Sequence, residues 1–271
     1  MDIKKEFDYI PQIDITAAQI GISKWSWIFI DSEDLEGAIQ IMVENNFDVL
    51  PIRDTAGRYD RYFSTVFPND FSSIEIRNIE DSVTIYYRLS FKDLIRKFKQ
   101  GKAKYFFVRD SDEILGLVTV ADLNTILVYN YLYTVISEIE RGISDLFEQF
   151  VDQEKVLRYF SESDNIEFQK VASYFRSAKE NNIESSIFQT LYLTHLSPLL
   201  KYFSDQIPSK YIKLKDFYPK LSTEGLFNII RKKVMHPVRP IISDMDSICQ
   251  IDELLHDYMV INSILNSKLE E

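Results

Sequence analysis

The first half of the chain repeats one pattern of apolar and polar positions. The first copy reads as a strand, a helix and two strands, over residues 27–30, 35–43, 47–52 and 59–64. The second repeats this order over residues 83–89, 91–99, 105–108 and 114–120, and Ala121 then opens a helical segment. Short apolar runs and 3.6-residue periodicity are typical of buried strands and amphipathic helices. The pattern predicts two tandem βαββα units.

From Ala121 onward the strand patterns disappear. Apolar residues recur at helical spacing from Ile126 to Phe150, which predicts one long helix. Further amphipathic segments cover residues 154–160, 167–178, 186–203, 222–234 and 246–265. The predicted fold class is therefore α+β: an N-terminal tandem βαββα module over residues 12–125, followed by an all-α helical bundle over residues 126–271.

Two segments at corresponding places in the repeat carry a family resemblance. The first copy contains Asp-Val-Leu-Pro-Ile over residues 48–52, and the second contains Gly-x-x-Thr-x-x-Asp over residues 116–122. With the parallel layout, these segments resemble a tandem pair of cystathionine-β-synthase (CBS) domains. Such pairs commonly bind adenine nucleotides in clefts between the copies. The resemblance implies a regulatory adenine nucleotide, such as AMP, ADP, ATP or a derivative.

The nucleotide-binding residues implied by this motif are Thr119 and Asp122. Asp122 at a helix start can accept hydrogen bonds from ribose hydroxyls, and Thr119 can donate to a phosphate near the helix N-terminus. The alternative is that both residues only cap the helix, because the same spacing serves capping equally well. The first copy has no aligned acidic residue and has Pro68 where its last helix should begin. We therefore expect at most one competent nucleotide site.

A second motif lies in the helical half, where Arg231 and His236 are separated by four residues. Arginine presents planar donors that suit phosphate, and histidine transfers protons near neutral pH. Arg-x4-His on a penultimate helix, before Pro-x-x-Pro, resembles the HEPN superfamily of helical bundles, found in RNA-cleaving toxins and RNA-processing factors. At ~100° per residue the two side chains point about 140° apart. The family builds its site from two such helices, so the resemblance implies a homodimer.

The resemblance assigns catalytic roles to Arg231, His236 and Lys232, and contacts with the RNA backbone to Lys233 and Arg239. Active members usually carry Asn, Asp or His at the position of Lys232, so this chain departs from the pattern there. The alternatives are that Arg231 forms a structural ion pair and that His236 caps the helix C-terminus. His195 is expected to be a core histidine, and His256 an exposed one.

Charge and composition limit the classes of function. The net charge is −11, yet residues 201–240 hold nine basic and three acidic residues, which fits an RNA-binding patch or an ordinary local fluctuation. The single cysteine, Cys249, excludes an intrachain disulfide and favours a reducing, cytoplasmic location. We expect no membrane span, no signal peptide and no bound metal, because no apolar run or metal-ligand spacing indicates one.

The function predicted from these features is an adenine-nucleotide-responsive, metal-independent endoribonuclease that acts as a homodimer. His236 would deprotonate a ribose 2′-hydroxyl and Arg231 would stabilise the phosphate, which leaves a 2′,3′-cyclic phosphate. No cofactor would be needed for catalysis, and an antitoxin or regulatory partner is expected. The alternative is a non-catalytic regulatory module for nucleotide binding and dimerisation, which Lys232 and the acidic total favour.

Overall fold

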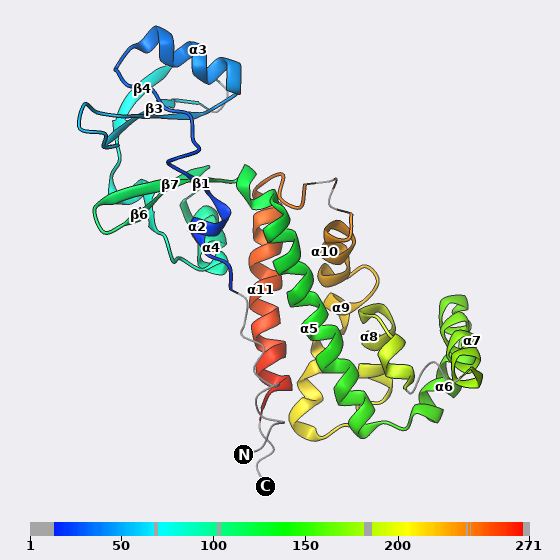
Figure 1. Cartoon of the computed structure of the whole chain (residues 1–271). Helices are drawn as coiled ribbons and strands as arrows, with labels where there is room; N and C mark the ends of the chain where they lie inside the picture. The colour runs from blue at the N-terminus through cyan, green and yellow to red at the C-terminus, as the bar shows by residue number, and fades with distance from the viewer. Residues whose placement is uncertain are drawn as a thin grey trace. The chain divides into compact units, whose positions relative to one another are not determined.

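A computed structural model describes residues 14–67, 70–101, 104–181, 186–236, 238 and 240–267. The chain divides into two units, the first ending at Val128 and the second beginning at Tyr129 (Figure 1). The first unit mixes short strands and helices, and the described part of the second is helical. The α+β class is thus confirmed at this level.

The first copy of the repeat contains α3 (Leu35–Asn45), β2 (Val49–Ile52) and β3 (Arg61–Thr65). Asp34 begins α3, because its side chain accepts the Glu36 N–H at 3.1 Å. Asn46, with φ of 55°, ends it in the left-handed conformation that asparagine tolerates. The predicted strand over residues 27–30 is reduced to a parallel bridge between Ile30 and Ile52.

The first copy departs from the predicted βαββα order at its last element. A strand, β4 (Ile74–Asn78), stands where the pattern required a helix, and it pairs antiparallel with β3 in a sheet of order β2-β3-β4. The local sequence Ile-Glu-Ile-Arg-Asn alternates apolar and polar residues, which is the two-residue period of a strand. The expected helix in this copy is therefore wrong.

The second copy follows the predicted order. It contains β5 (Thr84–Tyr86), α4 (Phe91–Gly101), β6 (Tyr105–Asp110) and β7 (Glu113–Thr119). A 3₁₀ turn, η2 (Ala121–Asn124), follows β7. The segment before the first copy adds α2 (Ala17–Ile20) and β1 (Ile22–Ser23), and β1 joins the second sheet in the order β1-β7-β6-β5. The sheet of the second copy thus includes a strand from the segment that precedes the first copy.

A shared aromatic core joins the two copies. Trp27 and Tyr62 from the first copy pack in one buried cluster with Phe107 and Leu117 from the second. The Tyr62 and Phe107 ring centroids lie 5.0 Å apart, and those of Trp27 and Phe107 6.2 Å apart in an edge-to-face arrangement. Each sheet therefore buries one face against the other copy.

The second unit confirms the helices expected from periodicity. They are α5 (Ile126–Phe150), α6 (Gln153–Ser161), α7 (Ile166–Glu180), α8 (Leu193–Tyr202), α10 (Leu226–Val234) and α11 (Met245–Leu265). The predicted helix over residues 186–203 divides into η3 (Ile187–Thr190) and α8. Two further pieces, η4 (Ser209–Phe217) and α9 (Tyr218–Leu221), were not predicted.

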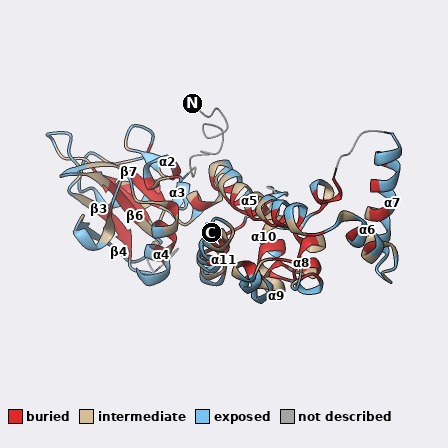
Figure 2. Cartoon of the chain, turned by 90° about the horizontal axis from the view of Figure 1, so that it is seen from below, coloured by how far each residue is buried: buried red, intermediate tan, exposed pale blue. Residues whose placement is uncertain are grey.

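Buried residues of the second unit gather on the facing sides of its helices (Figure 2). An ion pair links Lys220 of α9 to Asp257 of α11 at 2.5 Å, and the Asp257 side chain is only 6% exposed. A search of the described helices finds none long and apolar enough to cross a membrane.

Candidate functional site

A cleft of about 560 Å³ lies between the two copies of the first unit. The first copy contributes the end of α3 and the start of β2, including Asp48 and Val49. The second contributes Tyr105 of β6 and the turn that carries Thr119 and Asp122. Both residues implied by the Gly-x-x-Thr-x-x-Asp motif therefore line one cavity, together with apolar walls that suit a small organic ligand.

Thr119 and Asp122 also form hydrogen bonds with each other beside the helical turn that follows β7. The Asp122 Oδ2 atom accepts the Thr119 N–H at 2.7 Å and the Thr119 hydroxyl at 2.8 Å. Burial raises the pKa of the Asp122 carboxyl, and the hydrogen bonds from Thr119 oppose that shift. Among the described contacts, both hydrogen bonds to this carboxylate end on Oδ2. The two residues can therefore bond to each other and still line the cleft.

The cleft contains polar groups to which the sequence had given no role. The Asp48 carboxylate accepts the Thr65 hydroxyl at 3.2 Å and lies 3.6 Å from the Lys104 ammonium. Lys104 is about half exposed and brings a positive charge to the cleft. The Tyr105 hydroxyl lies 3.2 Å from that of Tyr62. Asp48 belongs to the motif that carried the resemblance, whereas nothing in the sequence pattern singled out Lys104.

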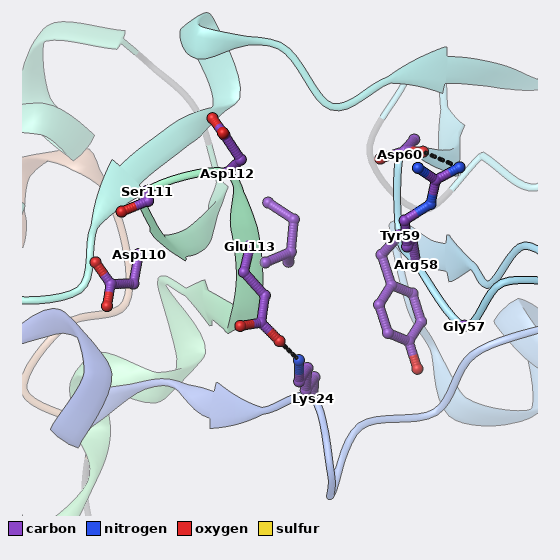
Figure 3. Close-up of a pocket in the computed structure, with 10 residues that line it drawn as sticks. Lys24, Gly57, Arg58, Tyr59, Asp60, Asp110, Ser111, Asp112 and Glu113 are labelled. Carbon is purple, nitrogen blue, oxygen red and sulfur yellow. Dashed lines mark hydrogen bonds and ion pairs between the residues drawn. The ribbon is translucent and has the colours of Figure 1, made fainter.

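A second cleft of about 570 Å³ lies between the β2–β3 and β6–β7 turns (Figure 3). Its walls carry the carboxylates of Asp60, Asp110, Asp112 and Glu113. Its two cations pair with carboxylates of the protein: Lys24 with Glu113, and Arg58 with Asp54 at 3.0 Å. A cleft rich in carboxylates repels a phosphate, so the cleft beside Thr119 is the better candidate for a nucleotide.

Arg231 of α10 lies within the packing of the second unit. Its Nε is 3.3 Å from the Glu140 Oε1 of α5, and its guanidinium carbon lies 4.5 Å from the Tyr192 ring centroid. The Nε–H makes no hydrogen bond within the described residues, so the contact with Glu140 is an ion pair only. The Arg231 side chain is 20% exposed. Its surroundings match the structural ion pair that was the alternative to catalysis.

Glu140 connects this cluster to a helix start. Its Oε1 also accepts the Leu193 N–H at 3.0 Å, at the beginning of α8. Burial raises the pKa of Glu140, while the Leu193 N–H and the Arg231 charge act in the opposite direction. The carboxylate thereby ties α5, α8 and α10 together.

The other residues of the Arg-x4-His segment lie at and beyond the end of α10. His236 is exposed, and its backbone N–H donates to the Lys233 carbonyl at 3.1 Å. Lys232 is also exposed, whereas the Lys233 ammonium donates to the Ile241 carbonyl at 3.4 Å. Arg239 lies outside the described residues. Within one chain, Arg231 contacts Glu140 and Tyr192 among the packed helices, whereas His236 is exposed to solvent.

Of the remaining histidines, His256 is exposed as expected, whereas His195 is only partly buried and is not a core residue. His195 is half-buried in the first turn of α8, and its Nδ1 accepts the Tyr192 N–H at 3.2 Å. Burial lowers its pKa. His256 is exposed. In the described ranges, no three His, Cys, Asp or Glu side chains are grouped as a metal site would require.

Comparisons with known proteins find likenesses to solved structures. CBSX2 in complex with AMP is 14% identical with a TM-score of 0.34, and the match covers 40% of this chain and 92% of that one. A CBS domain-containing protein from Bacillus anthracis is 13% identical with a TM-score of 0.33, covering 42% and 93%. A conserved CBS domain protein from Thermoplasma acidophilum is 16% identical with a TM-score of 0.32, covering 41% and 68%. No family model and no curated protein matches the chain.

Proposed function

We propose that the first unit is a CBS-type regulatory module that binds an adenine nucleotide in the cleft beside Thr119 and Asp122. One observation carries this proposal: both motif residues line a cavity built from the two copies. The strand and helix order of the second copy, and most of that of the first, agree with the same type of module. The non-catalytic alternative inferred from the sequence is thus the better supported function.

Different side chains of the cleft suit the ribose, the phosphate and the base of a nucleotide. The Asp122 carboxylate accepts the ribose hydroxyls through Oδ1, since Oδ2 already accepts two bonds from Thr119. Lys104 neutralises a phosphate, and Asp48 keeps that ammonium at the cleft. Apolar side chains such as Val49 and Leu117 contact the flat base.

Titration calorimetry with AMP and with ATP tests this proposal. Asp122→Ala should weaken binding at least about tenfold, or about 1.4 kcal/mol, because the ribose loses a charged acceptor. Asp112→Ala is the matched control, since it removes a carboxylate from the other cleft and should leave the affinity unchanged. Absence of binding, or an equal loss in both variants, would exclude the assigned cleft.

A second candidate is the metal-independent, homodimeric endoribonuclease with a composite Arg231–His236 site. The exposure of His236 and Lys232 at the end of α10 favours it, because a second copy can reach both. The contacts of Arg231 with Glu140 and Tyr192 favour a structural role instead. Only this candidate involves RNA, an antitoxin partner and contacts of Lys233 and Arg239 with the RNA backbone.

Cleavage of single-stranded RNA by the purified chain decides this candidate. His236→Ala should abolish formation of the 2′,3′-cyclic phosphate, while His256→Ala, which removes another exposed histidine, should not. Equal activity of the wild type and His236→Ala would eliminate the ribonuclease and leave the binding module.

A further inference from the structure

The strand that replaces the expected helix, β4, lies at the edge of its sheet. The order β2-β3-β4 pairs one side of β4 with β3, and no other described strand pairs with its outer side (Figure 1). Four of its five residues, Glu75 to Asn78, are exposed. An exposed edge presents unpaired N–H and C=O groups, which are a template for another strand.

The register with β3 fixes which backbone groups point outward. The Val66 N–H donates to the Ser73 carbonyl, and the Ile79 N–H donates to the Asp60 carbonyl, both at 2.9 Å. Hydrogen-bonded pairs alternate along an antiparallel ladder, so the backbone groups of Glu75 and Arg77 also point toward β3. Those of Ile74, Ile76 and Asn78 therefore point to the open side.

The side chains of β4 carry complementary charges on one face. Glu75 and Arg77 form an ion pair and are both about half exposed. Ile74 and Ile76 lie on the opposite face, where Ile74 packs on the core beneath α3 and Ile76 is 39% exposed. The strand thus offers one acid, one base and one exposed apolar side chain, arranged symmetrically about Ile76.

We propose that β4 pairs antiparallel with β4 of a second copy of this chain, about a two-fold axis at Ile76. Ile76 then lies opposite its own equivalent, and Ile74 lies opposite Asn78 of the other copy. These are the residues whose backbone groups point outward, so each opposed pair exchanges two N–H···O bonds. The interface is isologous and joins the two sheets into one of six strands.

This register also places the charges favourably. Glu75 of each copy lies opposite Arg77 of the other in non-hydrogen-bonded pairs, where side chains approach most closely. A shift by two residues in one direction opposes Glu75 to Glu75, and a shift in the other opposes Arg77 to Arg77. Like charges directly opposite one another destabilise a strand pair. The sequence of β4 therefore selects one register and one partner, its own copy.

Charges on an edge strand often prevent association, so their arrangement matters. A run of like charges would repel a second copy in every register. The single acid and single base of β4 instead attract when the strand meets itself antiparallel. Burial of Ile76 against Ile76 of the other copy adds apolar area to the contact.

The mass of the full chain in solution, measured by light scattering after size-exclusion chromatography, tests the proposal. Arg77→Glu places four carboxylates across the pair, so we expect the assembly to halve in mass, with a dissociation constant at least about tenfold higher. Exchanging the charges in the double variant Glu75→Arg/Arg77→Glu restores the complementarity and should restore the wild-type mass. Far-UV circular dichroism confirms that each variant is folded.

Three outcomes would overturn the proposal: a monomeric wild type, an unchanged mass of Arg77→Glu, or a double variant that remains small. A dimer made through the helical unit is distinguished because its mass does not respond to charges on β4. Hydrogen exchange provides a second readout, since the amides of Ile76 and Asn78 should be protected in the wild type and exchange freely in Arg77→Glu. Nucleotide binding is scored separately by Asp122→Ala, so either proposal can fail alone.

Discussion

At the scale of single residues, His195 shows how a backbone contact and burial set a protonation state. Its Nδ1 accepts the Tyr192 N–H, so the proton of the neutral ring is on Nε2. Burial disfavours the charged ring and lowers its pKa; the charge of Glu167 opposes this shift, and that of Arg231 adds to it. Protonation at Nδ1 would also remove the acceptor at the start of α8.

The stability of the chain should therefore depend on pH through His195. Its pKa is lower in the folded chain than in the unfolded chain, so its contribution to stability is complete above the unfolded value of 6.5. That contribution is lost as the pH falls from 6.5 toward the folded pKa. The free energy of unfolding in urea should differ less between pH 7.5 and pH 5.5 for His195→Asn than for the wild type. The asparagine amide oxygen can still accept the Tyr192 N–H. If the free energy of unfolding changes with pH as much in His195→Asn as in the wild type, the pH dependence arises from other groups.

At the scale of elements, the pairing of β1 with β7 explains the glycine of the Gly-x-x-Thr-x-x-Asp motif. Gly116 lies opposite Ser23, and a Cβ at this position would lie 2.3 Å from the Ile22 carbonyl oxygen. Backbone cannot move aside as a side chain can, so the close approach of the strands requires glycine here. The same motif thus positions β1 as well as Thr119 and Asp122.

Gly116→Ala should destabilise the first unit by about 1–3 kcal/mol, because the added methyl group displaces β1. Gly142→Ala is the control: its Cβ would meet the Leu265 side chain at 2.7 Å, which can rotate away, and alanine favours a helix. Urea unfolding measures both variants, by tryptophan fluorescence for Gly116→Ala in the first unit and by circular dichroism at 222 nm for Gly142→Ala in the second. Equal stability of Gly116→Ala and the wild type would contradict the tight β1–β7 approach.

A second element-scale prediction concerns the ion pair between α9 and α11. The Lys220 ammonium lies 2.5 Å from the buried Asp257 carboxylate and 2.9 Å from the exposed Glu253 carboxylate. Lys220→Met should leave the Asp257 charge buried without its cation and cost up to about 3 kcal/mol, reduced because Lys220 is partly exposed. Glu253→Gln should cost less than about 1 kcal/mol. Circular dichroism during urea unfolding compares the two, and similar losses would argue against a buried pair.

At the scale of the whole molecule, the two units have separate cores, and their unfolding is followed by different spectroscopic signals. Both tryptophans, Trp25 and Trp27, belong to the first unit, while the long helices α5 and α11 belong mainly to the second. Tryptophan fluorescence therefore follows the first unit, and circular dichroism at 222 nm is dominated by the second.

An adenine nucleotide that binds the first unit should shift the fluorescence transition to higher urea. At one hundred times its dissociation constant the expected stabilisation is about 2.7 kcal/mol. The circular dichroism transition should move less if the units unfold separately, and equally if they unfold together. If neither AMP nor ATP changes the urea midpoint of the fluorescence transition, the first unit does not bind these nucleotides.

Local periodicity in the sequence determined most elements of this protein. The helices α5, α6, α7, α8, α10 and α11 and the strands of the second copy follow patterns that each segment carries by itself. The Gly-x-x-Thr-x-x-Asp spacing also identified two residues that line a cleft. These features were predictable because hydrophobic spacing and helix capping depend on neighbours in the chain.

Contacts between distant segments were decided only by the tertiary structure. Whether residues 74–78 form a strand depended on β3 being available to pair with them, although their alternation was present in the sequence. Lys104 and Asp48 became cleft residues because β6 and β2 bring them together. Arg231 acquired Glu140 and Tyr192 as neighbours from helices about 40 to 90 residues earlier, which no local spacing could indicate. Packing sets such neighbours, so the role of a charged side chain depends on the fold around it.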